Sequence, residues 1–297
     1  MAVIEAVPNI SEGRRRDVLE LLAGAVSKVT GVSLLDLSAD PSHNRCVLTI
    51  IGDADPLLDA LLALYEIATR EVDLRRHRGV HPRIGAVDVV PFVPVRDTSM
   101  AECVELAGRL GRTVAERFSV PVFLYGEAAT RPERRALEEI RRGQFEGLGG
   151  KMASDLWQPD FGPERPNPSA GVSAIGARGP LIAFNVNLQS DDLEAARAIA
   201  RTIRERDGGL ACVKALGVRL EHRDLVQVSV NLTDYVKTPL HQVFGAIEQE
   251  ATRRGIGIVE SEVVGLAPMA AIVTAAADRL RLSGFSPNQV LEARLPF

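Results

Sequence analysis

The sequence predicts an α/β (α+β) protein of two tandem ferredoxin-like βαββαβ sandwich subdomains with a ligand cleft between them. Two observations lead to this prediction. Apolar segments with strand and helix periodicity follow the order βαββαβ over residues 3–95 and again over residues 181–266. The 297 residues are also enough to build two hydrophobic cores. We therefore expect subdomains at residues 1–178 and 179–297, each with helices covering one face of a sheet.

In the first half, a short apolar strand at residues 3–7 is followed by Ser11, which we expect to cap a helix with Glu12 in its first turn. A later helix, opened by Thr98 or Ser99, should end at Phe118. The other elements expected here are strands at 32–37, 46–51, 86–95 and 120–125, a helix at 55–72, and a charged, exposed helix at 132–142.

The second half repeats this rhythm. The expected elements are strands at 181–188, 212–220, 225–232 and 258–266, and helices at 191–206 and 239–254. Between the halves, residues 143–180 are rich in glycine and proline, which favours a flexible linker. Trp157 and Phe161 favour instead an ordered loop at the cleft, because a pure linker has little use for large apolar side chains.

The composition excludes several classes of protein. With 35 basic and 39 acidic side chains and 4% aromatic residues, the chain lacks the charge and the stacking surface of a nucleic-acid-binding protein. We expect no membrane association, because no run approaches the roughly 20 apolar residues of a spanning helix. The beginning of the chain has no signal-peptide pattern, and the three cysteines form no CxxC pair. These features predict a cytoplasmic protein with reduced thiols.

Residues 77–94, HRGVHPRIGAVDVVPFVP, are the most informative segment. They place His77 and His81 on a basic loop that enters a Val-rich strand, where either histidine could exchange a proton near neutral pH. Each could equally be a structural histidine bonded to backbone. Gly79 and Pro82 disfavour the helix that would place both on one metal, so we expect no metal site.

Other polar segments are individually weak. NISEGRR (9–15) could be a helix cap or an anion site, and DPSHNR (40–45) could be a hairpin loop or part of a site. SAIGARG (173–179) lacks the GK[ST] of a phosphate loop, so nucleotide binding is poorly supported. The asparagines of NVNL (185–188) and SVNLTDY (229–235) indicate either edge strands or a cleft. From these residues alone, we infer an enzyme with an acid–base histidine and an arginine-lined site for anions.

Taken together, seven ordered segments resemble the formiminotransferase family, which includes glutamate formiminotransferase and the N-terminal part of formiminotransferase–cyclodeaminase. The segments are VPNISEGR, DPSHNR, HRGVHPRIGAVDVVPFVPV, VPVFLYGEAA, WQPDFGP, GARGPLIAFNVNL and QVSVNLTDY. The resemblance covers nearly the whole chain and ends near GFSPNQVLEARL. It implies transfer of a formimidoyl group from N-formimidoyl-L-glutamate to tetrahydrofolate, giving 5-formimidoyltetrahydrofolate and L-glutamate. Tetrahydrofolate would be the co-substrate, both partners small molecules, and the protein a homodimer.

The resemblance also assigns residues. It implies that His81, in the HPR-x-GA motif, is the catalytic acid–base group. The matching folate-binding loop comprises Gly162, Pro163, Glu164, Arg165, Pro166, Asn167, Pro168, Ser169, Ala170 and Gly171. The middle of this loop, ERPN, departs from the family pattern. Ser38 stands where eukaryotic members have an acidic residue, so Asp40 would supply the carboxylate. Because no cyclodeaminase segment follows, we expect the product to be released rather than channelled.

Both substrates carry carboxylates, which guanidinium groups bind in bidentate fashion. We expect Arg45, Arg83 and Arg178, at loop–strand junctions, to hold them, and either Asp40 or Glu12 to assist His81. The full set of expected substrate-binding residues is Asn9, Glu12, Asp40, Arg45 and Arg178. Two alternatives remain: a folate-dependent transferase with another donor such as N-formylglutamate, and a non-catalytic folate-binding protein.

Overall fold

The structure is a computed structural model that describes residues 2–41, 43–79, 81–220 and 223–294. Contacts between Cα atoms divide the chain into two compact units, Met1–Arg178 and Gly179–Phe297. Each unit is an α/β sandwich with its own sheet, which confirms the predicted fold class. In the described ranges, no helix is long and apolar enough to cross a membrane.

The sheet of the first unit has a ferredoxin-like part and an extension. Its strands are β1 (Val3–Ala6), β2 (Asn9–Ile10), β3 (Val32–Asp40), β4 (Arg45–Gly52), β5 (Val87–Arg96), β6 (Val122–Gly126) and β7 (Ser173–Ala177). β3, β4, the β1–β2 pair and β5 lie side by side and are antiparallel to their neighbours. β7 and then β6 continue the sheet beyond β5 in parallel. The βαββαβ unit is therefore widened by two parallel strands.

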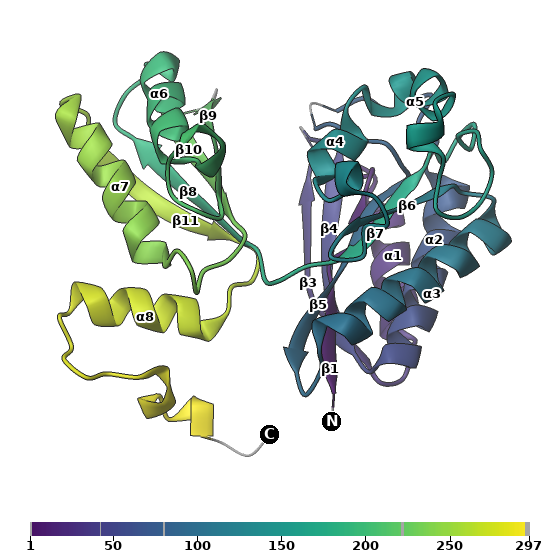
Figure 1. Ribbon diagram of the computed structural model, residues 1–297, viewed down its shortest axis with the longest axis horizontal. Coiled ribbons are helices and arrows are strands. Elements are labelled where there is room, and N and C mark those ends of the chain that lie inside the picture. Colours follow the sequence, from purple (N-terminus) through teal and green to yellow (C-terminus); the bar gives the residue numbers. More distant parts are fainter. Residues whose placement is uncertain (1, 42, 80, 221–222, 295–297) are drawn as a thin grey trace. The chain divides into compact units, whose positions relative to one another are not determined.

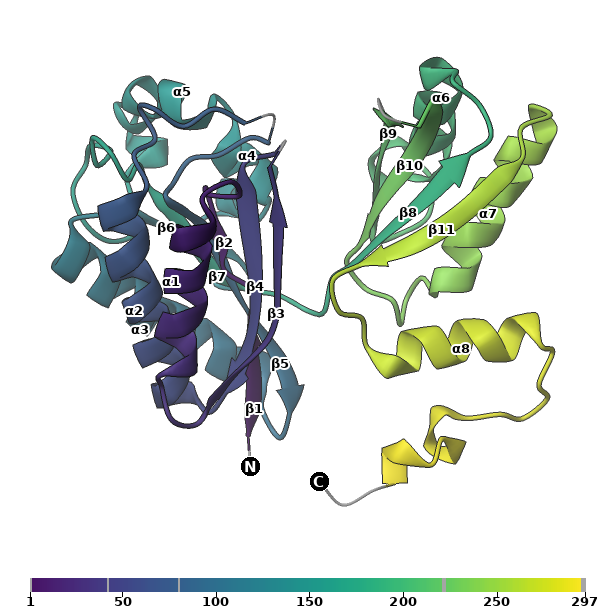
Figure 2. The same cartoon turned by 180° about the vertical axis from the view of Figure 1, so that it is seen from behind.

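Three helices cover one face of this sheet: α1 (Arg16–Ser27), α2 (Ala54–Glu71) and α3 (Met100–Phe118) (Figures 1 and 2). They pack a continuous apolar core against alternate residues of the strands, such as Cys46, Leu48 and Ile50 of β4. α3 begins with a capping box between Ser99 and Glu102, as Ser99 predicts. On the other face, α4 (Leu137–Arg141) and α5 (Gln144–Met152) join a smaller core, leaving the rest of that face without a helix of this unit.

The predicted helix start at Ser11 is wrong. α1 begins at Arg16, because residues 11–15 form an extended turn that packs on the end of the sheet. Ser11 donates its hydroxyl to the carbonyl of Gly85 and its N–H to the carbonyl of Ala86. Glu12 accepts the N–H groups of Arg14 and Arg15, so it caps the helix start from a position before the first turn.

One other prediction fails between residues 130 and 180, and one pair of alternatives is decided there. Residues 132–142 are not one exposed helix but η1 (Pro132–Arg134) and α4, and Arg134 is fully buried in an ion pair with Asp160. Residues 143–180 are not a flexible linker but ordered chain, which is the alternative that Trp157 and Phe161 favoured. They form α5, η2 (Asp155–Trp157), the loop at 158–172 and strand β7, all belonging to the first unit.

The second unit confirms the predicted βαββαβ order. Its elements are β8 (Ile182–Leu188), α6 (Leu193–Ile203), η3 (Glu205–Asp207), β9 (Val213–Leu220), β10 (Leu225–Leu232), α7 (Leu240–Arg253), β11 (Ile258–Val264), α8 (Met269–Arg279), η4 (Pro287–Gln289) and η5 (Glu292–Arg294). The sheet order is β11-β8-β10-β9, with every pair antiparallel. α6 and α7 pack on one face and bury its apolar residues.

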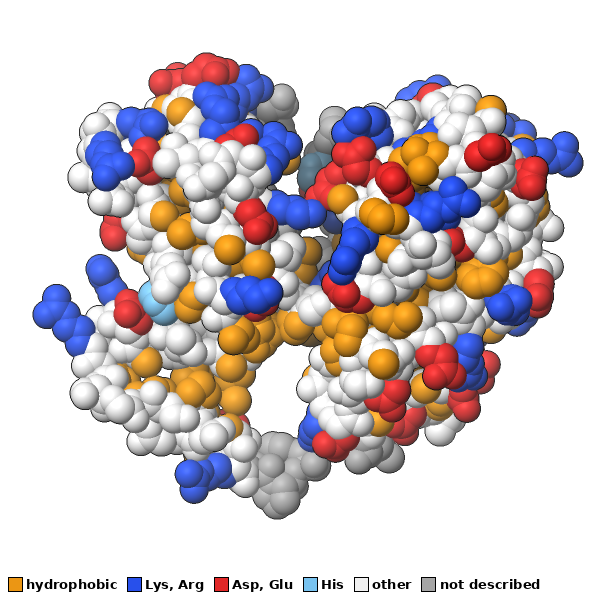
Figure 3. Space-filling view, viewed as in Figure 1, with side chains coloured by type: hydrophobic (Ala, Val, Ile, Leu, Met, Phe, Trp, Pro, Cys, Tyr) orange, Lys and Arg blue, Asp and Glu red, His pale blue; other side chains and the backbone are white. Residues whose placement is uncertain are grey.

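Charged side chains of both signs are interspersed on the face of the molecule seen in Figure 3. This pattern agrees with a formal net charge of only −4. Long-range attraction of a polyanion therefore has no support from this face, and local groups of residues must account for recognition of anions.

Candidate functional site

Three polar segments converge at one end of the first sheet. These are residues 9–15, which begin with β2, the described residues of 40–45, which join β3 to β4, and the described residues of 77–83, which precede β5. Asn44 joins all three, in a left-handed backbone conformation with φ of 50°. Its side-chain oxygen accepts the N–H of Gly13 at 3.0 Å, and its amide nitrogen donates to the carbonyl of Arg78 at 3.0 Å. The sequence motifs that were individually weak thus form one structure.

Glycine makes this convergence possible at two positions. A Cβ atom on Gly13 would lie 2.4 Å from the carbonyl oxygen of Asp40, and one on Gly79 would lie 2.1 Å from the carbonyl oxygen of His43. Both distances are far inside van der Waals contact with backbone atoms, which cannot move aside cheaply. The glycines therefore let the loops approach closely enough to share hydrogen bonds.

The two histidines of the 77–83 segment have different roles. His77 is buried, and both of its ring nitrogens have partners: Nε2 contacts the carbonyl of Asn44 at 2.8 Å, and Nδ1 accepts from Arg83 at 3.2 Å. A histidine bonded in this way fastens one loop to another. His81 is partly buried, and among the described residues its Nε2 contacts a side chain, that of Arg45, rather than a carbonyl, while its Nδ1 has no partner.

Arg45 is the direct neighbour of His81. Its Nη1 lies 2.5 Å from His81 Nε2, across 36 residues of sequence. Burial, followed by the positive charges of Arg45 and Arg141, lowers the pKa of His81 to about 3. The His43 ring lies 5.8 Å from the His81 ring, tilted by 48°. His81 is therefore neutral at physiological pH in this arrangement.

Asp88 and Arg141 complete the site, and sequence reasoning missed both. Asp88 is 1% exposed and is the extra residue of a β-bulge in β5, since Ile10 pairs with Val87 and Asn9 with Val89. Its carboxylate accepts the N–H of Ile84 at 2.7 Å and two guanidinium nitrogens of Arg141. Bulges of this kind re-aim side chains next to active sites. The signal was a single acidic residue within an otherwise apolar strand, GAVDVVPFVP.

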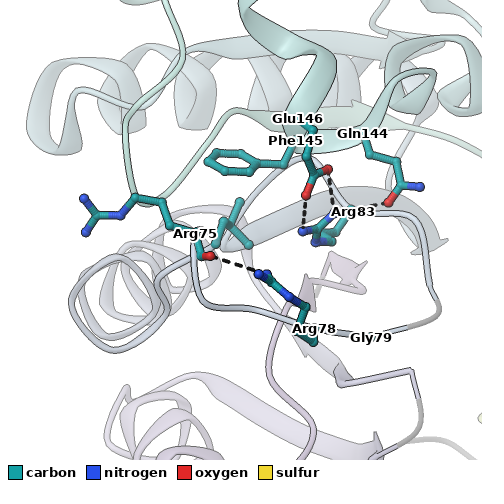
Figure 4. Close-up of a pocket in the computed structure, with 8 residues that line it drawn as sticks. Arg75, Arg78, Gly79, Arg83, Gln144, Phe145 and Glu146 are labelled. Carbon is teal, nitrogen blue, oxygen red and sulfur yellow. Dashed lines mark hydrogen bonds and ion pairs between the residues drawn. The ribbon is translucent and has the colours of Figure 1, made fainter.

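Arg83 is not a free carboxylate clamp, contrary to the prediction. It is 8% exposed, and its two terminal nitrogens bind both carboxylate oxygens of Glu146 at 2.9 and 2.7 Å (Figure 4). Its guanidinium is thereby committed to the protein's own α5. Arg83 also lines a cavity of about 500 Å³, together with residues that include Arg75, Arg78 and Phe145. This cavity adds cationic groups beside the loop that carries His81.

The two carboxylates considered as partners of His81 have hydrogen-bond partners of their own. Burial raises the pKa of Glu12, but the N–H donors of Arg15 and Arg14 outweigh it, so the pKa lies below its ordinary value. Glu12 is therefore an ionised helix cap. Asp40 accepts the N–H of His43 at 2.9 Å, lies 3.7 Å from its ring nitrogen Nδ1, and pairs with Arg45 across strands β3 and β4. Asn9 is buried in β2, where its amide donates to the carbonyl of Val7.

Arg178 follows strand β7 at the end of the first unit. Its N–H bonds to the carbonyl of Phe92 in β5. Its positive charge and a side-chain hydrogen bond act on Tyr125, whose pKa is raised chiefly by burial. The charges of Arg141 and Asp88 also act on Tyr125, so this side chain is near both Arg178 and the group around His81.

The predicted folate loop, residues 162–171, is ordered at both ends. Gly162 and Gly171 have positive φ values of 92° and 70°, and Asn167 and Gly171 exchange two backbone hydrogen bonds of 2.9 Å. Ala170 accepts the N–H of Ala86, so the end of the loop is fixed to the start of β5. Between these anchors, residues 163–165 are exposed. The loop and His81 thus share one end of the sheet.

The remaining sequence signals are structural. SAIGA of the glycine-rich segment is the buried strand β7. Asn185 and Asn187 lie on the helix-free face of β8 and donate to Glu262 and Glu260. Burial raises the pKa of the Cys46 thiol to about 12, which leaves it unreactive. Across the described ranges, no group of three or more His, Cys, Asp or Glu residues could hold a metal ion.

Comparisons with known proteins agree with this geometry. Residues 3–178 match the family model described as "Formiminotransferase domain, N-terminal subdomain", and residues 183–283 match "Formiminotransferase domain". A glutamate formimidoyltransferase of Streptococcus pyogenes is 42% identical, covering 99% of this chain and 98% of that protein. One from Thermoplasma acidophilum is 45% identical over the same shares. The formimidoyltransferase-cyclodeaminase of Rattus norvegicus is 43% identical over 93% of this chain and 52% of its own length. The chain belongs to the formiminotransferase family.

Proposed function

We propose that this protein is a glutamate formimidoyltransferase, which moves the formimidoyl group of N-formimidoyl-L-glutamate to N5 of tetrahydrofolate, and that His81 is its acid–base group. The full-length likeness to two glutamate formimidoyltransferases supports the reaction. The observation that carries the residue assignment is the His81–Arg45–Asp88–Arg141 group. It combines a neutral histidine with two guanidinium groups at the end of the sheet where the three polar segments converge.

The chemistry requires one proton to move between two nitrogens. N5 of tetrahydrofolate attacks the formimidoyl carbon, a new N5–C bond forms, and the C=N π electrons move to nitrogen. His81 takes the N5 proton as a neutral base and then gives it to the nitrogen of glutamate. The electron pair on the formimidoyl nitrogen re-forms the C=N bond as the old bond between the formimidoyl carbon and the glutamate nitrogen breaks. The amine leaves because it is protonated, and L-glutamate is released. Acid–base assistance of this kind is typically worth about 10²–10⁴-fold in rate.

Recognition of the two anionic substrates falls to separate cationic groups. Arg45 is next to the reacting centre, and Arg178 is fixed through its backbone to Phe92 of β5, so one substrate carboxylate at each is the arrangement we propose. Arg78 in the adjoining cavity offers further charge, whereas Arg75 is paired with Asp73. The exposed middle of the 162–171 loop would contact tetrahydrofolate, with its anchored ends setting the loop's position. Asn9, Glu12 and Asp40 would act by holding the loops in place.

The proposal also includes the compartment and the oligomeric state of the protein. The protein would act in the cytoplasm, where its three free cysteines remain reduced, and it would be a homodimer. Sedimentation at micromolar protein concentration measures the second point directly, and a monomer there would contradict it.

A spectrophotometric transferase assay tests the proposed function. The protein is incubated with tetrahydrofolate and N-formimidoyl-L-glutamate, then acidified, which converts the product to 5,10-methenyltetrahydrofolate. We expect an absorbance burst that requires both substrates. N-formyl-L-glutamate, which differs by O for NH, serves as the matched donor. A burst with the formyl donor alone would assign a different reaction, and no burst with either would remove the transferase function.

A further inference from the structure

The contact between Arg45 and His81 fixes the protonation state of the histidine. A guanidinium group has five N–H donors and no acceptor. Its Nη1 lies 2.5 Å from His81 Nε2, so Nε2 must accept this hydrogen bond through its lone pair. The proton of the neutral ring must then be on Nδ1. Nδ1 is buried and has no hydrogen-bond partner among the described residues.

This arrangement is unfavourable for a working base. The lone pair that should take the proton from the attacking amine is already engaged by a cation. The charged groups facing the ring are Arg45 from β4, Arg141 from α4 and Asp88 from β5, with His43 from the adjoining loop. The buried carboxylate among them, Asp88, is held by Arg141, so it does not draw Arg45 away. In the free protein, therefore, the proton-accepting nitrogen of His81 is occupied by Arg45.

We propose that Arg45 caps the proton-accepting nitrogen of His81 and that a carboxylate of the donor substrate removes this cap by pairing with Arg45. This inference rests on the proposed function. The donor carboxylate is then needed to activate the base and not only to bind the donor. Arg45 becomes a specificity-determining residue, because a donor without a correctly placed carboxylate leaves the histidine capped.

The balance of interactions favours this exchange. A guanidinium–carboxylate pair is charge-assisted on both sides and bidentate, whereas a guanidinium–imidazole hydrogen bond is charge-assisted on one side. Pairing also neutralises one of the two cations that hold the pKa of His81 down. The pKa of His81 then rises toward the working pH, and proton transfer is most efficient when the two are close. Activation thus coincides with arrival of the group to be transferred.

Nitrogen-15 NMR of protein labelled at the histidine rings tests this proposal, because ring nitrogen shifts distinguish the two neutral tautomers from the cation. His81→Asn identifies the signals. In the free protein we expect the Nδ1–H tautomer and no titration between about pH 5 and 8. Adding L-glutamate should raise the pKa of His81 by at least about one unit. Glutaramide, which has the same chain length without charge, should leave the signals unchanged.

Arg45→Gln should raise the pKa of His81 without any ligand, and L-glutamate should then add no further change. Arg16→Gln is the matched control, since it removes a positive charge from the exposed start of α1. Titration of His81 near its ordinary value in the free protein, an Nε2–H tautomer, or no response to L-glutamate would each overturn the cap. If Arg45→Gln does not fold, the L-glutamate titration of the unaltered protein still decides. Loss of the transferase function would appear separately, in the assay with N-formimidoyl-L-glutamate.

Discussion

The two sheets of this protein share one topology but carry different chemistry, on the helix-free face of the second sheet and at one end of the first. In the second unit, Asn187 donates to Glu260 and accepts from Gln227, and Asn185 donates to Glu262, so carboxylates meet amides in regular cross-strand rows. In the first unit, a neutral histidine lies among two arginines and a buried aspartate. The first arrangement is internally satisfied, and the second leaves one ring nitrogen, His81 Nδ1, without a partner among the residues that the structure describes.

The difference coincides with departures from the shared fold. β10 pairs with β8 and β9 in unbroken register, as expected of a plain ferredoxin-like sheet. β5 contains a bulge at Asp88, is extended by the parallel strands β7 and β6, and receives Arg141 from the added helix α4. The reactive group of side chains thus forms where residues were added to the template or where its regularity is broken.

The largest expected effect is a loss of turnover when a histidine is removed from the first unit, compared with removal of one from the second. His81→Ala should lower turnover by at least about 100-fold, because the proton can no longer be passed between the two nitrogens. Tetrahydrofolate affinity, measured by fluorescence titration, should change little. The matched control is His241→Ala in the second unit, where the ring lies 3.8 Å from Asp278 on the outer helices. Near-normal turnover of His81→Ala would remove it from the mechanism.

Asp88→Asn and Glu260→Gln together compare the loss of a buried charge with the loss of an exposed one. Asp88→Asn should destabilise the protein by about 3 kcal/mol, because Arg141 is left partly buried without its carboxylate. Glu260→Gln in the second unit breaks an ion pair with Arg223 in which both side chains are 48% exposed, so its effect should stay below about 1 kcal/mol. Urea unfolding measures both. Equal losses in the free energy of unfolding would show that the two ion pairs do not differ as described.

Arg178→Ala tests whether the site extends along β5. Losing a charge-assisted contact with a substrate carboxylate should raise a Michaelis constant by about 10-fold and leave turnover at saturation nearly unchanged. Steady-state kinetics with each substrate varied in turn shows which one is affected. Unchanged constants for both would show that Arg178 does not hold substrate.

The pH dependence of stability tests the same histidine without a change in activity. The pKa of His81 is about 3 in the folded state, against about 6.5 when unfolded, so the unfolded state binds the extra proton between these values. The folded state therefore loses stability as pH falls through this window, by up to about 1.4 kcal/mol per pH unit. In His81→Gln this contribution should vanish, giving a shallower decline between pH 4 and 6. Parallel declines would mean that His81 titrates normally.

Much of this fold was predictable from the sequence, because most elements carry their own signals. Alternating apolar residues marked the strands of the second unit, and Ser99 with Glu102 marked the start of α3. β7 was missed because it is a strand of five small or apolar residues buried on both faces, so it shows no alternation. Its identity depends on pairing with β5 and β6, which local sequence does not encode.

The site was predictable in part and for a similar reason. The residue types and the loops at strand ends pointed to the end of the sheet where these segments converge, and the family resemblance selected His81 over His77. The contacts that define the site join Arg45 to His81 across 36 residues and Arg141 to Asp88 across 53. Neither pairing has a periodic signal. The same holds for Arg83, whose partner Glu146 lies 63 residues away.

The central claim is that the imidazole of His81 carries the proton, and chemical rescue tests it most directly. His81→Gly leaves room for a small base, so free imidazole should restore formimidoyl transfer in a saturable way. The restored rate should rise with pH through the pKa of the added imidazole, and methylated imidazoles of different pKa should shift the profile accordingly. A variant that binds tetrahydrofolate normally but gains no rate from any of these bases would contradict the account.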